Sequence, residues 1–285
     1  MPLRLRGRTM PGYAVMAIVN RTPDSFYDKG ATFAFDQARR RVDDVVADGA
    51  AIVDVGGVKA GQGPDVSVTE EIGRTAALVA AIRDDHPDVV ISVDTYRAPV
   101  AEAVCEAGAD LINDTWAGAD PDVAMVAGRR GAGLVCSHTG GLPPRTDPHR
   151  PLYDDVVASV LSTTTALAER AVAAGVSRDA ILIDPTHDFG KNTYHSLELT
   201  RRLGELCASD WPVLVSLSRK DFVGETLGVG VHDRLYGTLA ATAVSAWHGA
   251  QVFRAHDVAA TRQVLDMVAS IKGERAPDAP RRGLA

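Results

Sequence analysis

Residues 89–114 read VVISVDTYRAPVAEAVCEAGADLIND, and this stretch decides the fold. Two apolar runs, 89–94 and 110–113, frame a stretch of helical character at 98–107 that ends before Gly108. Both runs are compact and lack polar alternation, which is typical of strands buried on both faces of a parallel sheet. A glycine after a helix accepts the left-handed backbone with which many helices end. The stretch therefore predicts one β–α–β unit.

The same alternation continues along nearly the whole chain. The expected strands are residues 14–20, 51–55, 89–94, 110–113, 133–138, 181–184, 213–217 and 251–256. The expected helices are residues 35–48, 69–85, 98–107, 153–174, 196–208, 234–248 and 258–272. Ser67 and Glu70 have the spacing of a capping box before the second of these helices. Eight strand–helix units in about 250 residues favour a (β/α)₈ TIM barrel of the α/β class over an open doubly wound sheet, which stays the alternative.

The remaining segments have the composition of ends and loops. We expect the barrel, a single domain, at residues 13–272, a flexible N-terminal segment at residues 1–12 and a flexible tail at residues 273–285. Residues 140–151 contain four prolines and predict a loop over one face of the barrel.

Composition excludes several classes of protein. Of the 285 residues, 46% are hydrophobic, and 30 Lys and Arg stand against 37 Asp and Glu, so the formal net charge is −7. A mildly acidic chain is not expected to be a dedicated nucleic-acid or membrane-surface binder. No apolar stretch approaches the roughly 18 residues of a membrane span, and no apolar segment follows the N-terminal arginines as a secretion signal requires. Three scattered cysteines indicate reduced thiols in a cytoplasmic protein.

Polar residues follow each apolar strand. They are Asn20, Asp54, Asp94-Thr95, Asn113-Asp114, Ser137-His138, Asp184, Ser216 with Ser218, and His256-Asp257. Any one of them could simply cap the next helix, Asp257 most of all. In a barrel, however, the carboxyl ends of the strands converge on one mouth, where chemistry takes place. We therefore expect a polar, partly acidic mouth with Lys220 and Arg254 in it or beside it.

The chemistry of this mouth fits a phosphorylated polar heterocycle. Carboxylates bind a ring edge that presents adjacent N–H donors, because two parallel hydrogen bonds match their geometry. Lys220 and Arg254 suit phosphate oxygens. The amide oxygen of Asn20 suits Mg²⁺, which takes few protein ligands and completes its shell with water and phosphate.

Seven segments, taken in order, resemble the motifs of dihydropteroate synthase. Asn20-Arg21-Thr22-Pro23-Asp24-Ser25-Phe26 is similar to N-V-T-P-D-S-F, and Asp54-Val55-Gly56-Gly57 to D-I-G-G. Ser92-Val93-Asp94-Thr95 and Ile112-Asn113-Asp114 match the third and fourth strand ends. Asp184-Pro185 with Phe189-Gly190-Lys191-Asn192 resembles D-P-G-x-G-F-G-K-[TN]. Ser218-Arg219-Lys220 matches S-R-K, and Arg254 with His256-Asp257-Val258 resembles R-V-H-D-V. Each match is weak alone, but seven in order at strand ends are a strong signal.

The resemblance covers about residues 14–270 and implies a fold, a reaction and a set of roles. Family members are (β/α)₈ barrels, generally homodimers, that join 6-hydroxymethyl-7,8-dihydropterin pyrophosphate to 4-aminobenzoate for folate synthesis. They release pyrophosphate and form 7,8-dihydropteroate. The implied pterin-binding residues are Asp94, Asn113, Asp184, Lys220 and Arg254. The implied pyrophosphate-binding residues are Asn20, Arg254 and His256. The implied aminobenzoate pocket consists of Ser218, Arg219 and Phe189.

The resemblance also implies how the reaction proceeds. Lys220, Arg254 and His256 would be the catalytic residues, and Asn20 would help to carry Mg²⁺. Metal and cations stabilise the leaving charge, so that a pterin methylene cation forms and is trapped by the aryl amine. The reaction needs no protein nucleophile.

The chain departs from the family pattern in the loops around the mouth. Lys59, Ala60 and Gly61 stand where the family has Ser, Thr and Arg of E-S-T-R-P-G, in a loop that helps to close the site. Thr186-His187-Asp188 replaces Gly-x-Gly, which adds bulk and charge beside the ligand. Further differences are Ser216, Asp221, Arg21 and Lys29. His187 could serve as a new catalytic base, although a loop histidine without that role is the more ordinary interpretation.

These departures favour a diverged paralogue with weak or absent synthase activity, since a single lost catalytic donor is worth about 3 kcal/mol. The alternatives are a fully active synthase and a non-catalytic pterin-binding, anion-binding or regulatory protein. A pterin-dependent methyltransferase is less favoured, because Ser218-Arg219-Lys220 and the Arg254 and His256 pair resemble the synthase.

Overall fold

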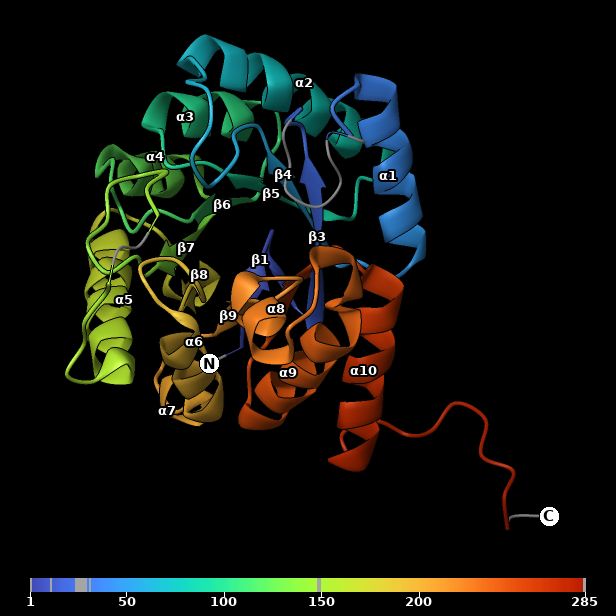
Figure 1. The fold of residues 1–285 in the computed structure, drawn as a ribbon. Helices are drawn as coiled ribbons and strands as arrows, with labels where there is room; N and C mark the ends of the chain where they lie inside the picture. The colour runs from blue at the N-terminus through green and yellow to red at the C-terminus, as the bar shows by residue number, and fades with distance from the viewer. Residues whose placement is uncertain (1, 11, 24–29, 31, 148–149, 284–285) are drawn as a thin grey trace.

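The computed structural model describes residues 2–10, 12–23, 30, 32–147 and 150–283. The motif residues Asp24, Ser25 and Phe26, and Lys29, lie outside this part of the chain. Within it, eight parallel strands form a nearly closed barrel surrounded by helices (Figure 1). The strands are β3 (Ala14–Asn20), β4 (Ile52–Gly56), β5 (Val90–Asp94), β6 (Leu111–Asp114), β7 (Gly133–Ser137), β8 (Ile181–Asp184), β9 (Leu214–Ser216) and β10 (Val252–Ala255). All eight expected strands are present, and the barrel is confirmed.

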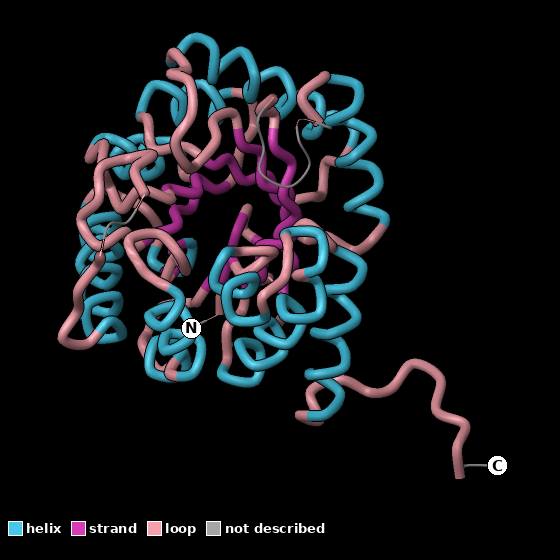
Figure 2. Tube along the Cα trace, viewed as in Figure 1, coloured by secondary structure: helices cyan, strands magenta, loops and turns pink. Residues whose placement is uncertain are grey.

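The sheet runs in the order β8-β7-β6-β5-β4-β3-β10-β9. A parallel bridge between Ile183 and Val213 links its two outer strands, β8 and β9. The magenta strands of Figure 2 accordingly curve around the barrel axis inside a ring of helices. This closure rules out the open sheet.

The helices cover the outside of the barrel. They are α1 (Phe35–Ala47), α2 (Val68–Asp85), α3 (Ala98–Glu106), α4 (Asp122–Arg130), α5 (Val156–Ala173), α6 (Thr193–Arg201), α7 (Leu203–Cys207), α8 (Asp221–Leu227), α9 (Leu235–His248) and α10 (Val258–Ile271). Two 3₁₀ turns, Arg178–Ala180 and Val231–Asp233, complete the set. The sequence reasoning missed α4 and α8 and treated α6 and α7 as one helix. The capping box is half formed, because Ser67 accepts from the Glu70 N–H while the Glu70 carboxylate pairs with Arg74.

Helix α5 is long and apolar enough to cross a membrane by length and composition alone. In the barrel its buried residues, among them Val157, Val160 and Ala168, face strands β7 and β8. One helix of this kind is weak evidence of a membrane span.

The N-terminal residues differ from the expected flexible segment. Arg4–Leu5 (β1) and Arg8–Thr9 (β2) pair as a short antiparallel hairpin. The side chains of Leu3 and Leu5 are buried against the barrel interior, next to Met16, Leu111 and Leu182. Burial of these two leucines stabilises the ordered segment. The hairpin therefore plugs the inside of the barrel. The end of the chain, from Gly273 to Gly283, extends away from it as an exposed segment (Figure 1).

Side chains alternate along each strand, and this places the site. On β3 the odd-numbered Val15, Ala17 and Val19 pack toward the helices, whereas Ala14 and Met16 face the barrel interior. Continuing that alternation brings the polar ends of the strands onto the inner face above an apolar floor.

Candidate active site

An ion-pair network occupies the mouth of the barrel. Asp54 is 0% exposed, and its Oδ2 accepts from Arg254 Nε at 2.6 Å and from Asn113 Nδ2 at 3.2 Å. Its Oδ1 accepts from Ser92 Oγ at 2.6 Å. Arg254 Nη2 also reaches Asp94 Oδ2 at 3.0 Å. One guanidinium thus joins two carboxylates from neighbouring strands.

Burial sets the protonation of Asp94. Removal from water raises the pKa of its carboxyl to about 7, and the charge of Asp54 adds to this, while Arg254 opposes it. Thr115 Oγ1 donates to Asp94 Oδ1 at 3.0 Å and favours the charged form. A carboxyl with a pKa near neutrality can accept or donate a hydrogen bond at a ring edge.

Asp184 and Lys220 lie on the other side of the mouth. Asp184 Oδ1 accepts from the Thr186 N–H at 2.7 Å, and burial raises the pKa of this carboxyl against the charge of Lys220. Lys220 Nζ donates to the backbone oxygen of His187 and stands 4.9 Å from the ring centre of Phe189. Burial lowers the pKa of Lys220, whereas Asp188 and Asp184 raise it.

Asn113 carries a signal of a missing ligand. Its Oδ1 is buried and has no hydrogen-bond partner, although its Nδ2 is bound to Asp54. A buried unpaired acceptor costs free energy, so it points to a donor supplied from outside. A donor-rich ring edge over the barrel floor would satisfy it.

His256 and Ser218 form a pair at the ends of β10 and β9. His256 N and Nδ1 lie 3.2 and 3.1 Å from Ser218 Oγ. Burial lowers the pKa of His256 to about 3, with Arg254, Arg219 and Arg41 acting in the same direction. The imidazole is therefore neutral near pH 7.

Arg219, which the resemblance assigns to the aminobenzoate pocket, has its guanidinium bound to groups of the protein. Its guanidinium pairs with both oxygens of Asp257, at 2.9 and 3.1 Å, and donates to the carbonyls of Val231 and His232. Asp257 stands at the N-cap position of α10 but binds Arg219 instead of capping the helix. A buried bidentate pair of this kind holds the loops together.

The loop after β8 has an unusual backbone. Thr186 has φ of 53° and Asp188 has φ of 71°, at the two positions where the synthase motif has glycine. A β-branched residue in this region is strained. Thr186 compensates with Oγ1, which donates to the Asp184 carbonyl at 3.0 Å and accepts from His138 N at 3.2 Å.

His187 is not placed as a catalytic base. It is fully buried, stacks on Phe222, and its Nε2 lies 3.1 Å from Thr200 Oγ1. Burial holds the pKa of His187 well below its usual range. Lys191 has a structural role in the same loop, because its Nζ donates to the carbonyls of His138, Thr186 and Phe189 at 2.9 to 3.2 Å.

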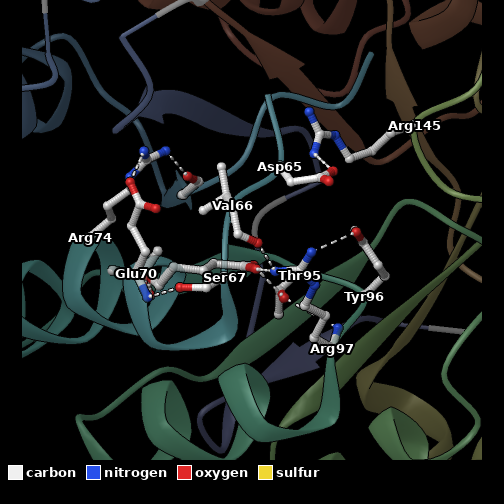
Figure 3. A network of polar contacts seen from close by, with 12 residues as sticks. Asp65, Val66, Ser67, Glu70, Arg74, Thr95, Tyr96, Arg97 and Arg145 are labelled. Atoms are coloured by element: carbon white, nitrogen blue, oxygen red, sulfur yellow. Dashed lines mark hydrogen bonds and ion pairs between the residues drawn. The ribbon is translucent and has the colours of Figure 1, made fainter. Parts of the chain in front are cut away.

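The loop after β4, residues 57–66, is fastened by arginines from outside it (Figure 3). Arg145, in the expected loop at residues 140–151, donates to Pro64 O at 2.9 Å and Gly61 O at 3.4 Å, and Asp65 lies 4.0 Å away. Arg97 donates to Val66 O at 2.8 Å and pairs with Glu71. Arg74 donates to Gly57 O at 2.9 Å. Arginines from other segments thus bind backbone carbonyls of this loop. The synthase motif has an arginine within the loop, at the position of Gly61.

The described residues contain no cluster of three or more acidic, histidine or cysteine side chains suited to a metal. The amide oxygen of Asn20 is a type of ligand that Mg²⁺ accepts. This Oδ1 atom would lie 2.9 Å from a Cβ built at Gly56, so a side chain there would crowd this oxygen. Mg²⁺ bound mainly by water and a diphosphate needs few protein ligands.

The mouth therefore brings together Asp94, Asn113, Asp184, Lys220 and Arg254, with Asn20 on the adjoining strand end. Sequence reasoning did not assign roles to Asp54, Thr115, Asp188, Lys191 or Arg145. Strand alternation could have found Asp54, because it has the same parity as the inward-facing Ile52. Nothing in the linear sequence links Arg145 to residues 61–65.

Known proteins share this architecture. A model of the pterin binding enzyme family matches residues 16–256. The inactive dihydropteroate synthase 2 of Mycobacterium leprae is 60% identical over 275 residues, covering 95% of this chain and 94% of that protein. The dihydropteroate synthase of Haemophilus influenzae is 36% identical over 252 residues, covering 88% and 91%. The Yersinia pestis synthase, solved with a sulfonamide drug, superimposes with a TM-score of 0.91 at 35% identity, covering 96% of this chain and all of that one. This chain therefore belongs to the pterin-binding enzyme family, alongside the dihydropteroate synthases and their diverged paralogues.

Proposed function

We propose that the chain is a diverged dihydropteroate synthase that binds a pterin pyrophosphate at the mouth and has weak or no synthase activity. One observation carries the proposal: the mouth keeps the residues assigned to the pterin, while the loop after β4 lacks the residues of the synthase motif. The mouth contains Asp94, Asn113 and Asp184, whereas the loop that would close over the second substrate has Lys59, Ala60 and Gly61. A relative with 60% identity bears the name of an inactive synthase.

The polar residues of the mouth would bind and orient the pterin ring. Asp184 and Asp94 accept from N–H groups of the pterin, and the unpaired oxygen of Asn113 accepts another. Asp94 Oδ2 can accept from the ring while it stays paired with Arg254, because a carboxylate oxygen has two lone pairs. Neutral His256 offers the diphosphate a hydrogen bond without a positive charge.

Mg²⁺ would be held by Asn20 together with the diphosphate. When bound, it would stabilise the negative charge of the leaving pyrophosphate. The loop that would sequester this charge lacks its own arginine, and the missing donors account for slow turnover.

We also infer a homodimer through α9 and α10. Tyr236 is 83% exposed and Trp247 56% exposed on α9, and Val244 lies between them on the same face. Met267 and Ile271 are exposed on the adjacent helix α10. A patch of this kind favours a protein interface.

The direct test is turnover of the pterin pyrophosphate with 4-aminobenzoate and Mg²⁺, with pyrophosphate and dihydropteroate measured separately. We expect binding of the pterin and turnover at least about 100-fold below that of the Haemophilus influenzae synthase. The variant Asp184→Asn controls for binding at the mouth. Turnover equal to that of the synthase would support the fully active alternative, and an absence of pterin binding would remove the pterin site.

The non-catalytic alternative rests on the same altered loop. The triple variant Lys59→Ser, Ala60→Thr, Gly61→Arg separates the two. A gain of turnover in this variant shows that the mouth retains synthase chemistry. If turnover stays absent while the pterin still binds, a purely binding or regulatory role is favoured.

A further inference from the structure

The segment Thr186-His187-Asp188 is fastened to the beginning of α8. Lys220 Nζ donates to His187 O, and Phe222 N donates to Asp188 Oδ2 at 3.2 Å. The rings of His187 and Phe222 stack at 5.5 Å with 29° between their planes. We call these contacts, between residues 186–188 and residues 220–222, the clasp.

The clasp is fixed on its loop side as well. Asp188 Oδ1 accepts from Ser196 Oγ at 3.0 Å, and the backbone N–H of Asp188 donates to the same hydroxyl at 3.1 Å. The carboxylate is thus held by donors from α6 and α8 at once. Its negative charge lies beside Lys220, which is itself buried above Phe189.

On its loop side the clasp contains Thr186 and Asp188, which stand where the synthase motif has glycine. A Gly-x-Gly segment has no carboxylate to bind the N-terminus of α8 or to attract Lys220. We propose that Asp188 is a positioning residue that acts through Lys220: the clasp holds the Lys220 ammonium on the carbonyl of His187 and so weakens its contact with a bound pterin. This inference rests on the proposed function of the mouth.

Electrostatics agree with this geometry. Asp188 is foremost among the charges that raise the pKa of Lys220, followed by Asp184, while Arg254 lowers it and Asp221 raises it. Lys191 also lies close enough to interact with Lys220. Removal of the Asp188 charge therefore shifts the balance toward neutral Lys220, and this shift can be measured.

The experiment uses two substitutions that suit the left-handed backbone at residue 188. Asp188→Gly removes the carboxylate at a φ that glycine adopts freely. Asp188→Asn keeps the side-chain size and removes only the charge. Calorimetry measures the affinity for the pterin pyrophosphate with Mg²⁺, in the wild type and in a Lys220→Met background. NMR of the lysine side chain follows the pKa of Lys220.

We expect Asp188→Gly to bind the pterin pyrophosphate about tenfold more tightly, the scale of one hydrogen bond to a charged group. In the Lys220→Met background the same substitution should have no effect. In Asp188→Asn the pKa of Lys220 should fall. An equal gain in the Lys220→Met background, or unchanged affinity and pKa, would overturn the inference. If no variant binds the pterin, the proposed function fails, and the pKa alone decides: a fall supports a link between Asp188 and Lys220, and an unchanged pKa refutes it.

Discussion

Arg254 is the only described side chain that forms ion pairs with both Asp54 and Asp94. Replacement by methionine keeps much of the volume and removes the charge. Loss of one partner of a buried ion pair costs about 3–5 kcal/mol, because the other charge stays buried and unpaired. Ser92 and Asn113 still donate to Asp54, so we expect a value near the lower limit, about 3 kcal/mol at pH 8.

The stability lost in Arg254→Met should be larger at high pH than at low pH. Without Arg254, the pKa of Asp94 rises above its present value of about 7. The folded variant then binds a proton that the unfolded chain, with an ordinary carboxyl, releases at much lower pH. Stability of the variant therefore rises as pH falls through this window. The difference from the wild type should be smaller at pH 5 than at pH 8.

Urea unfolding at both pH values measures this difference. Arg39→Met is the matched control, since Arg39 pairs with Asp85 on the exposed surface and its loss should have little effect. The reasoning is refuted if Arg254→Met is as stable as the wild type at pH 8, or if its loss is the same at both pH values.

Three further predictions concern the hairpin, the fastened loop and the exposed helices. Leu5→Ala should lower the free energy of unfolding by about 2–5 kcal/mol in urea titrations, because Leu5 is 1% exposed within the barrel floor, whereas Arg8→Ala on the same hairpin should not. Arg145→Ala should speed hydrogen exchange of residues 57–66, since it removes the donor to Gly61 and Pro64; unchanged exchange there would show that Arg145 does not fasten the loop. Trp247→Glu should convert a dimer to a monomer in light scattering, and a wild type that is already monomeric would contradict the inferred interface.

The sequence was sufficient for the eight strands because their apolar runs are short, buried on both faces and separated by clear helix ends. Gly108, expected to follow the end of a helix, has φ of 113°. Helix α4 was missed because it is short and contains Gly128. A side chain there would meet the backbone of Ala174, with a Cβ 2.2 Å from its oxygen. Gly128 therefore allows helix α4 to pack closely against the end of α5, a contact that the sequence alone does not show.

The polar residues at the strand ends predict where the candidate site lies, but they do not predict which side chains contact one another there. Asn113 faces the barrel while its neighbour Asp114 turns back to bind the N–H groups of Trp116 and Gly118. Strand alternation distinguishes the two, and a list of polar strand ends does not. The contacts of Arg145 and Asp188 join loops that are distant in sequence, so local patterns could not show them.

The most direct test of the pterin site is a crystal structure of the chain with the pterin pyrophosphate and Mg²⁺. The account predicts the ring above the apolar floor of the barrel, with Asp184, Asn113 and Asp94 on its edge. Density for the ligand elsewhere, or a bound ring that contacts neither Asp184 nor Asn113, would contradict it.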